Sequence, residues 1–520
     1  MNFKIGEKDY KKLLCLALAF TFLWGLAAHG YGFSQSAFSH DSLNEFYAAD
    51  GGNSWKIEIG RIFVPAYRAV FRTDLTLPWM IGLLSLVWTG LAVYLVAQLL
   101  RIRCVWTLFL TAGIMTTNLT VISGIGTYMN DHDGNMLAML CAVAAVWCWN
   151  RHIWGVVPGA MLVAASLGIY QSYVCVTITL VMLVCILDLL ELESFRKVFC
   201  RGLRAVAMLL AGGILYWLLM KLVLHATGIG LATGGSNSLN FMENLEGASI
   251  PFLVVFTYFD CWNRLVNMVS PYPGALVKGI VVCVLALTLA GGIRSLCRKE
   301  MGWLERLLVM VLVALLPVGM NLMYIPTVTI VHDLMVYALW FAYLLALLMA
   351  PWVARWLPES AGKLRAGVRW VIPAMVLVLL YGNVQTANAV YLKKDLEQDA
   401  YLSYMTRVVY QMEQTEGYEP GNTPVVFVGL PEQEIPVIPG FERYRAITGA
   451  DTPYVTELRT NTRAQRYFTY ILSNPAVMAD NGTWASIQAD PRVEQMPSYP
   501  QEGCTALFDG VLVVKVGRSG

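Results

Sequence analysis

The sequence predicts a mainly α-helical, polytopic membrane protein, a bundle of about eleven transmembrane helices followed by a small α/β domain at the carboxyl end. Three observations support this prediction. Of 520 residues, 57% are hydrophobic and only 14% are charged, and the mean hydropathy is +0.56. Apolar runs long enough to cross about 30 Å of hydrocarbon recur up to residue 390. From about residue 391, Asp, Glu, Gln, Asn, Pro and Gly return.

Eleven apolar runs are predicted to be transmembrane helices. They cover residues 12–30, 79–100, 105–123, 134–150, 153–169, 173–190, 205–225, 275–293, 307–324, 334–352 and 370–388. Lysines precede the first run, as in a signal peptide, but no small-x-small cleavage site closes it. We therefore expect the first run to remain as a membrane anchor.

The basic residues predict the orientation of the bundle, because Lys and Arg are enriched in cytoplasmic loops. They collect in alternate loops, within 101–103, at 151, and within 196–204, 294–306 and 355–369. We expect these loops and the amino terminus to be cytoplasmic, and everything after residue 390 to lie outside. Two outer loops are long, 31–78 and 226–274, and their aromatic-rich stretches 58–71 and 252–268 are expected to form interfacial helices.

The tail is predicted to form a compact, water-soluble α/β domain. The chain then divides into a transmembrane domain at 1–390 and an extracytoplasmic domain at 391–520. Residues 394–415 have apolar side chains at helical spacing, and 424–429 and 510–517 are typical of strands. Cys504 is the single cysteine of the tail, so packing must stabilise this domain. The net charge of +2 is spread over many loops and indicates no nucleic-acid partner.

Ionisable residues of the membrane domain gather on the predicted outer side, at three places. His40 and Asp41 open the first outer loop. The short loop before the fourth helix reads Asn130-Asp131-His132-Asp133, and Tyr170-Gln171 lies in the turn between the fifth and sixth helices. Because polar groups are costly at membrane depth, these are the candidate functional residues.

A carboxylate in this setting can take the proton of an acceptor hydroxyl while cationic side chains hold a phosphate leaving group. The candidate carboxylates are Asp41, Asp131 and Asp133, and the available cations are Arg61, Arg68, Lys221, Arg264 and Lys278. A divalent metal stays open because the carboxylates cluster, although the sequence contains no clean set of ligands.

Structural alternatives exist for several of these residues. Asp133 precedes Gly134 and the fourth apolar run, so it could cap that helix. Arg61 could pair with Glu58, and Lys221 could anchor its helix at the interface. The Asp-His-Asp spacing within so short a loop favours a functional role over capping.

Several short motifs occur in a fixed order along the chain. They are His40-Asp41, Gly60-Arg61, Asn130-Asp131-His132-Asp133, Tyr170-Gln171-Ser172 and, near the end, Met496-Pro497-Ser498-Tyr499-Pro500. In these features, which extend over nearly the whole chain, the sequence resembles the bacterial glucosyl transferase II family. These multi-spanning enzymes are associated with serotype-converting glucosylation of O-antigen.

The resemblance implies a membrane-embedded glycosyltransferase of the C type (GT-C). Such an enzyme moves a hexose, here glucose, from a polyprenyl phosphate to an extracytoplasmic glycan such as O-antigen, and uses no nucleotide sugar. The resemblance also implies the bacterial inner membrane as location and a separate synthase and flippase as partners that supply the donor. We expect a single displacement that inverts the configuration at C1 of the sugar. The resemblance identifies no cofactor with certainty.

The resemblance further implies roles for individual residues. Asp41 is the leading catalytic base, and Asp131 and Asp133 could exchange roles with it. Arg61 is expected to bind the phosphate. The other residues expected to bind substrate are His40, His132, Tyr170, Gln171, Lys221 and Arg264.

Two other classes of membrane protein remain as alternatives. A lipid-linked glycan flippase or transporter, and a polysaccharide polymerase or ligase, would also have many spans and a large outer loop. A flippase would need charged residues at mid-membrane, and a transporter would show repeated halves, neither of which the sequence contains. The clustering of carboxylates on one face favours the transferase.

Overall fold

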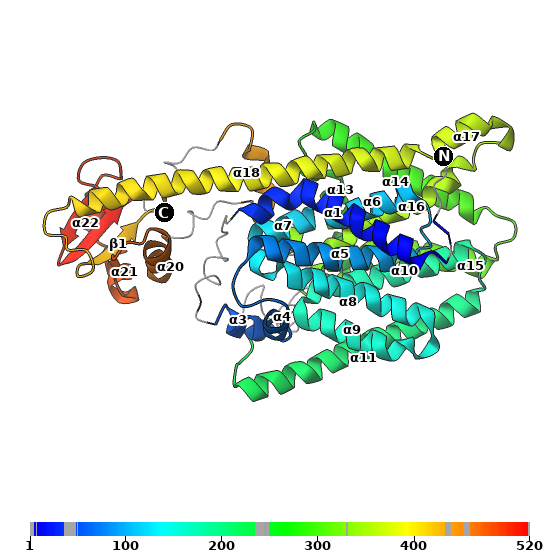
Figure 1. Ribbon diagram of the computed structural model, residues 1–520, viewed down its shortest axis with the longest axis horizontal. Coiled ribbons are helices and arrows are strands. Elements are labelled where there is room, and N and C mark those ends of the chain that lie inside the picture. Colours follow the sequence, from blue (N-terminus) through cyan, green and yellow to red (C-terminus); the bar gives the residue numbers. More distant parts are fainter. Residues whose placement is uncertain are drawn as a thin grey trace. The chain divides into compact units, whose positions relative to one another are not determined.

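The structure is a computed structural model that describes residues 5–6, 8–35, 48, 50–233, 245, 249–328, 331–431, 438–450 and 458–517. It is built mainly from helices, with a small sheet in the carboxyl-terminal part (Figure 1). The chain divides into two compact units. The first contains the residues up to Ser34, Asn53–Ile125 and Asp131–Asn388, and the second contains Gly126–Asn130 and the chain from Ala389.

Nine helices among the described residues are long and apolar enough to cross a membrane. They lie at Tyr10–Ser34, Pro78–Leu99, Val105–Thr127, Gln171–Leu190, Phe195–Thr227, Gly274–Leu296, Trp303–Met320, Tyr337–Ala354 and Glu359–Glu413. The other two predicted spans coincide with α8 (His132–Arg151), whose first turn is polar, and with α9 (Val156–Ile169), which is shorter. Each of the eleven predicted apolar runs therefore lies in helical structure, and nine have the length and composition of a membrane span.

The third predicted span is divided into α6 (Val105–Thr116) and α7 (Leu119–Thr127). Polar side chains explain the break, because Thr, Ser and Asn compete with the backbone for hydrogen bonds. The Asn118 Nδ2 donates to the Ile114 carbonyl over 2.9 Å, and its Oδ1 accepts from the Val121 amide over 3.1 Å. Thr116 and Thr117 donate to the carbonyls four residues earlier.

The stretch 58–71, predicted to form an interfacial helix, contains the last residue of one short helix and the whole of a second. They are α3 (Asn53–Glu58) and α4 (Val64–Phe71), and the turn between them contains Gly60 with φ +75°. A left-handed residue ends a helix, and glycine adopts this conformation without steric cost. The other predicted interfacial stretch lies in α13 (Ile250–Val266).

The second unit contains the end of α18 (Val371–Glu413) and a four-stranded sheet. The sheet order is β2-β1-β4-β3, with β1 parallel to both β2 and β4. Its strands are β1 (Pro424–Val428), β2 (Val477–Met478), β3 (Thr505–Phe508) and β4 (Val511–Lys515). The two predicted strands correspond to β1 and β4. Gly510 is instead in the turn of the β3–β4 hairpin, because Asp509 and Gly510 are both left-handed, as a tight type I′ turn requires.

The core of the second unit is apolar and accounts for most of its aromatic residues. Val425, Phe427 and Val513 are fully buried in the sheet, and Phe468 packs against Phe427 at 5.2 Å between ring centroids. Trp484 is also buried. These side chains form the core of the second unit.

Candidate active site

A buried ion cluster in the first unit surrounds Asp131. The carboxylate accepts from Lys56 Nζ at 2.5 Å, from Arg68 Nη2 at 2.8 Å and from Arg61 Nη1 at 3.4 Å. Lys56 lies on α3, Arg68 lies on α4, and Arg61 lies in the turn between them. Two short helices of one loop, with the turn between them, therefore place three cations around a single carboxylate.

A second carboxylate, that of Asp133, lies two residues further along the chain, at the start of α8 (His132–Arg151). Asp133 Oδ2 accepts from Arg72 Nε over 2.8 Å and from the Tyr67 hydroxyl over 2.9 Å. Trp88 Nε1 donates to the same hydroxyl at 3.2 Å. Asp133 Oδ1 accepts from the adjacent Gly134 amide over 2.9 Å, but α8 begins at His132, so Asp133 lies in the first turn and is not the residue that caps the helix. We call Lys56, Arg61, Arg68, Arg72, Asp131 and Asp133 together the Asp131 cluster.

The Asp131 cluster is almost entirely out of water. The side chains of Lys56, Arg68, Arg72, Asp131 and Asp133 are all at most 3% exposed, whereas that of Arg61 is 15% exposed. Burial alone would raise the pKa of Asp131, but the charges of Lys56, Arg68 and Arg61 outweigh it and hold the pKa well below its usual range. Asp131 is therefore ionised at neutral pH.

The cluster is rich in cations. Among the described residues, Lys56, Arg61, Arg68 and Arg72 surround the carboxylates of Asp131 and Asp133. Burial first and then the Asp133 carboxylate raise the pKa of Tyr67, so its hydroxyl keeps its proton and donates. Ionised donors make strong hydrogen bonds to an oxyanion, so a buried group of lysine and arginine side chains is suited to binding one.

Arg61 is the least constrained cation of the cluster. Its contact with Asp131 is the longest, and its Nε atom is buried without a hydrogen-bond partner among the described residues. The guanidinium lies over the Tyr170 ring, 4.6 Å from the centroid. Arginine stacked on an aromatic ring keeps its donors free to grip an oxyanion with two hydrogen bonds.

The turn before Arg61 is held from two other helical elements. The Tyr216 hydroxyl of α11 (Phe195–Thr227) donates to the Gly60 carbonyl over 3.0 Å. Gln171 Nε2 donates to the Ile59 carbonyl over 3.0 Å and to the Tyr216 hydroxyl over 3.3 Å. These bonds fix the backbone that carries Arg61.

The other predicted site residues lie in different surroundings. His132 is buried beside Gly124. Arg264 donates to Asp260 and to Asp333, each over 2.7 Å, and Lys221 lies 4.3 Å from the centre of the Trp217 ring. The structure therefore brings Arg61, Asp131, Asp133, Tyr170 and Gln171 together, whereas Lys221 and Arg264 have their contacts elsewhere. His40 and Asp41 lie outside the described residues.

Comparison with known proteins decides the family. The family model described as Glucosyl transferase GtrII matches residues 30–349, more than half of the chain, and this range includes the whole Asp131 cluster. The chain belongs to the glucosyl transferase GtrII family. Membership implies a glucosyltransferase and confirms the resemblance seen in the sequence motifs. No curated protein and no solved structure matches the chain.

Several residues in and around the Asp131 cluster of this glucosyl transferase were not predicted from the sequence. Lys56 and Arg72 were not among the candidate cations, and neither Tyr67 nor Tyr216 was singled out. One signal was present: Lys56, Arg61, Arg68 and Arg72 all lie in a loop predicted to be outside, where the distribution of charges disfavours basic residues. Basic residues that oppose this rule indicate a function for their charge.

Metal ligation was left open by the sequence. In the part of the chain that the structure describes, no three His, Cys, Asp or Glu side chains form a group that could hold a metal ion. The oxygens of Asp131 and Asp133 are instead occupied by lysine and arginine donors. A divalent metal at the clustered carboxylates stays an untested prediction.

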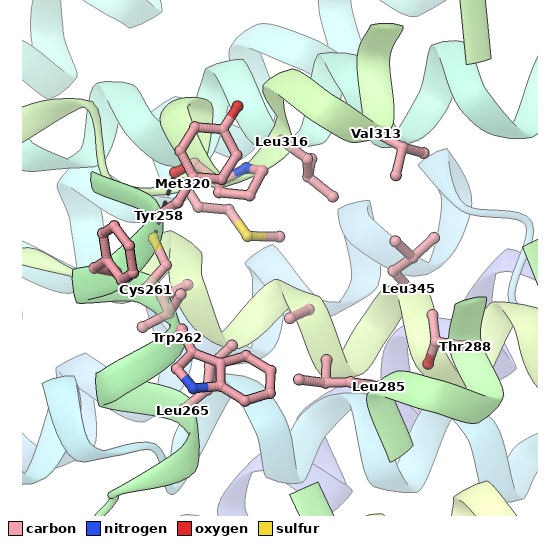
Figure 2. Close-up of a pocket in the computed structure, with 14 residues that line it drawn as sticks. Tyr258, Cys261, Trp262, Leu265, Leu285, Thr288, Val313, Leu316, Met320 and Leu345 are labelled. Carbon is pink, nitrogen blue, oxygen red and sulfur yellow. Dashed lines mark hydrogen bonds between the residues drawn. The ribbon is translucent and has the colours of Figure 1, made fainter. Parts of the chain in front are cut away.

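The glucosyl transferase also has an apolar cavity within its first unit. The cavity has a volume of about 570 Å³ and is lined from α13, α14 (Gly274–Leu296), α15 (Trp303–Met320), η7 (Tyr337–Trp340) and α16 (Phe341–Ala354). Figure 2 shows aliphatic and aromatic side chains such as Trp262, Leu285 and Leu345 around it. Its lining is suited to hydrocarbon.

Proposed function

We propose that this protein transfers glucose from a polyprenyl-phosphate-linked donor to an extracytoplasmic glycan, such as O-antigen or another surface polysaccharide. The observation that carries the proposal is the buried Asp131 cluster, in which the Arg61 side chain is partly exposed. A glucosyltransferase must stabilise the group that leaves C1 of the sugar. Buried cations are suited to a phosphate in that position.

The charge of the cluster favours the transition state over bound donor. In a polyprenyl-phosphate sugar the phosphate is a diester with one negative charge. When the C1–O bond breaks, the lipid phosphate becomes a monoester that carries up to two negative charges near neutral pH. Cationic donors at the phosphate stabilise the second state more than the first, which is the condition for accelerating the reaction.

Arg61 is the candidate for the direct phosphate ligand. It is the most exposed cation of the cluster, and its Nε is without a partner in the described structure. In this proposal the phosphate replaces part of the long contact between Arg61 and Asp131. Lys56 and Arg68 then stay on Asp131 and supply the surrounding positive charge.

Asp41 is proposed as the base that takes the proton of the acceptor hydroxyl as its oxygen attacks C1. Asp131 is less suited to this step, because the three cations that lower the pKa of Asp131 also make it a weak base. Asp131 would instead position the cations. One attack on C1 with departure of the lipid phosphate inverts the configuration of that carbon.

The lipid part of the donor requires apolar surface, and the cavity in the first unit offers it. We propose the inner membrane of a bacterium as the location, with the amino terminus cytoplasmic and the carboxyl-terminal unit outside. A synthase and a flippase would then make the donor and bring it to the outer face. The acceptor glycan is the second substrate.

The test is sugar transfer by the purified protein in detergent. Synthetic polyprenyl-phosphate-glucose is offered with a mixture of glycan acceptors, and UDP-glucose is offered in a parallel reaction. We expect transfer from the lipid donor alone, with inverted configuration at C1, and its loss in Asp41→Asn. The Asp41→Asn protein should elute in size-exclusion chromatography as the unmodified protein does.

Other results would overturn the proposal. Transfer from UDP-glucose would place the activated donor in water and remove the role of the lipid phosphate. Donor binding without transfer to any acceptor, together with movement of the lipid donor across proteoliposome bilayers, would indicate a flippase.

A further inference from the structure

A group of arginines gathers at the ends of two neighbouring membrane helices, α14 and α16, which pack side by side in the first unit (Figure 1). The guanidinium of Arg355 lies 3.9 Å from the centre of the Trp352 ring, and that of Arg298 lies 5.2 Å from it. Arg294 joins them, because its Nε donates to the Arg355 carbonyl over 3.3 Å. Two segments 60 residues apart in sequence thus place three arginines around one tryptophan.

These arginines are not neutralised in the way that buried cations elsewhere in the first unit are. The facing carboxylates in the described structure are Glu300, 3.9 Å from Arg298, and Glu359, 3.5 Å from the nearby Arg365. The two glutamates are 67% and 95% exposed, so water screens them. By contrast, the 2%-exposed carboxylate of Asp188 binds both Arg101 and Arg201 at the end of α10 (Val174–Leu190).

Crowding of like charge affects the arginines themselves. Partial burial lowers the pKa of Arg355, and the charges of Arg298, Arg365 and Arg294 lower it further. Backbone carbonyls hold two of the neighbours in place: Arg298 donates to Leu190 over 2.8 Å and Arg294 to Arg355. The arrangement keeps mutually repelling cations together, which an anion bound between them would stabilise.

The surroundings indicate which anion would bind. The arginines lie at the ends of apolar helices with the length of membrane spans, and Trp356, 55% exposed, lies beside Arg294 at 5.8 Å. Tryptophan is enriched at the level of the lipid headgroups. Basic groups between membrane helices bind anionic lipid headgroups, and arginine grips a phosphate with two donors. Basic residues here would also set the topology, but that effect requires no clustering around one ring.

We propose that Arg294, Arg298 and Arg355, arranged around Trp352, form a binding site for the phosphate headgroup of an anionic phospholipid. The site is separate from the Asp131 cluster and has no part in the transfer reaction. Its occupant is a structural lipid of the surrounding bilayer, held at the ends of α14 and α16.

The experiment uses the full chain in detergent and measures lipid binding by native mass spectrometry. Phosphatidylglycerol, phosphatidylcholine and inorganic phosphate are the three probes. We expect phosphatidylglycerol to bind and to raise the apparent unfolding temperature, and the other two to do neither. The Arg298→Gln/Arg355→Gln variant should lose about twenty-fivefold in affinity for phosphatidylglycerol, because each basic side chain near a membrane surface contributes roughly fivefold.

Matched variants keep the test decisive. Arg151 also stacks on a tryptophan, Trp147 at 4.7 Å, but its other contact in the described structure is the uncharged Gln98. Arg151→Gln should therefore keep full affinity. Arg355→Gln alone changes an exposed side chain and should show about a fivefold loss if the double variant is unstable.

Three results would overturn the proposal. The first is unchanged phosphatidylglycerol affinity in both arginine variants. The second is equal binding of phosphatidylcholine, which would indicate apolar contacts. The third is an equal thermal shift with inorganic phosphate, which would indicate a site for a soluble anion.

Discussion

At the scale of single residues, Asp131 is the centre of the site because it holds three cations that would otherwise repel each other. Taking charges out of water is costly, and only close pairing compensates for that cost. Asp131 meets Lys56 and Arg68 on different oxygens and leaves Arg61 at 3.4 Å. Asp131 therefore has two tightly bound cations and one that is available to a ligand.

The first prediction concerns the ionisation of Asp131. Asp131→Asn removes the charge and leaves Lys56 and Arg68 buried without it, so stability at pH 7 should fall by about 3–5 kcal/mol. The pKa of Asp131 is lower in the folded protein than in the unfolded chain, so its contribution is fully present above the ordinary value of about 3.9. It is lost as the pH falls toward the folded value.

Thermal unfolding in detergent tests this prediction between pH 3.5 and 8. The gap in apparent unfolding temperature between the unmodified protein and Asp131→Asn should be constant from pH 5 to 8 and begin to narrow only below about pH 4. A gap that closes between pH 5 and 7 would mean that Asp131 is not held in the ionised form.

At the scale of elements, the loop 53–72 depends on two short helices and a left-handed turn. Sequence patterns predicted helical structure between 58 and 71, but not the break at Gly60. Nor could they predict that α3 and α4 would place Lys56 and Arg68 against the two carboxylate oxygens of Asp131. Hydrophobic periodicity reports which face of a helix is buried, whereas contacts between polar residues far apart in sequence depend on the tertiary fold.

The turn that carries Arg61 provides the second prediction. Tyr216→Phe removes the hydroxyl that donates to the Gly60 carbonyl and accepts from Gln171. We expect kcat/KM for sugar transfer to fall by about fivefold, the equivalent of roughly one hydrogen bond. The fall should be in kcat, because Arg61 would be misplaced for the leaving phosphate while the donor still binds.

Tyr410→Phe is the control, because the Tyr410 side chain is 64% exposed in the second unit. It should leave both kcat and KM unchanged. A loss in Tyr216→Phe that appeared only in protein yield or thermal stability, with kcat intact, would mean that the Tyr216 hydroxyl has a purely structural role.

At the scale of the whole molecule, composition and apolar runs were sufficient to predict a helical membrane protein with a small sheet near its carboxyl end. Strands β1 and β4 were predictable because β-branched residues fill them, whereas the two-residue strand β2 has no such pattern. The helix predicted at 394–415 is the continuation of α18, since no Gly or Pro interrupts the chain between 374 and 413 except Gly382. A single glycine is tolerated within a long helix.

The third prediction concerns orientation. Cysteines introduced at Glu359 and Asp509, which have 95% and 80% exposed side chains, should react differently in intact cells. In a background without the native cysteines, a membrane-impermeant maleimide should label Asp509→Cys directly and Glu359→Cys only after permeabilisation. The reverse pattern would put the carboxyl-terminal unit in the cytoplasm.

Arg61 is proposed as the ligand of the leaving phosphate, and the rate of a single turnover with polyprenyl-phosphate-glucose tests this role most directly. Arg61→Gln should slow the chemical step by about 10²–10³, the usual effect of removing one group that stabilises a developing oxyanion. Arg61→Lys should recover part of the rate, because it restores the charge without the two-donor grip. Arg151→Gln, at the separate Trp147 contact, should react at the full rate. If Arg61→Gln transferred glucose as fast as the unmodified protein, the phosphate would leave from another site and the central claim would be wrong.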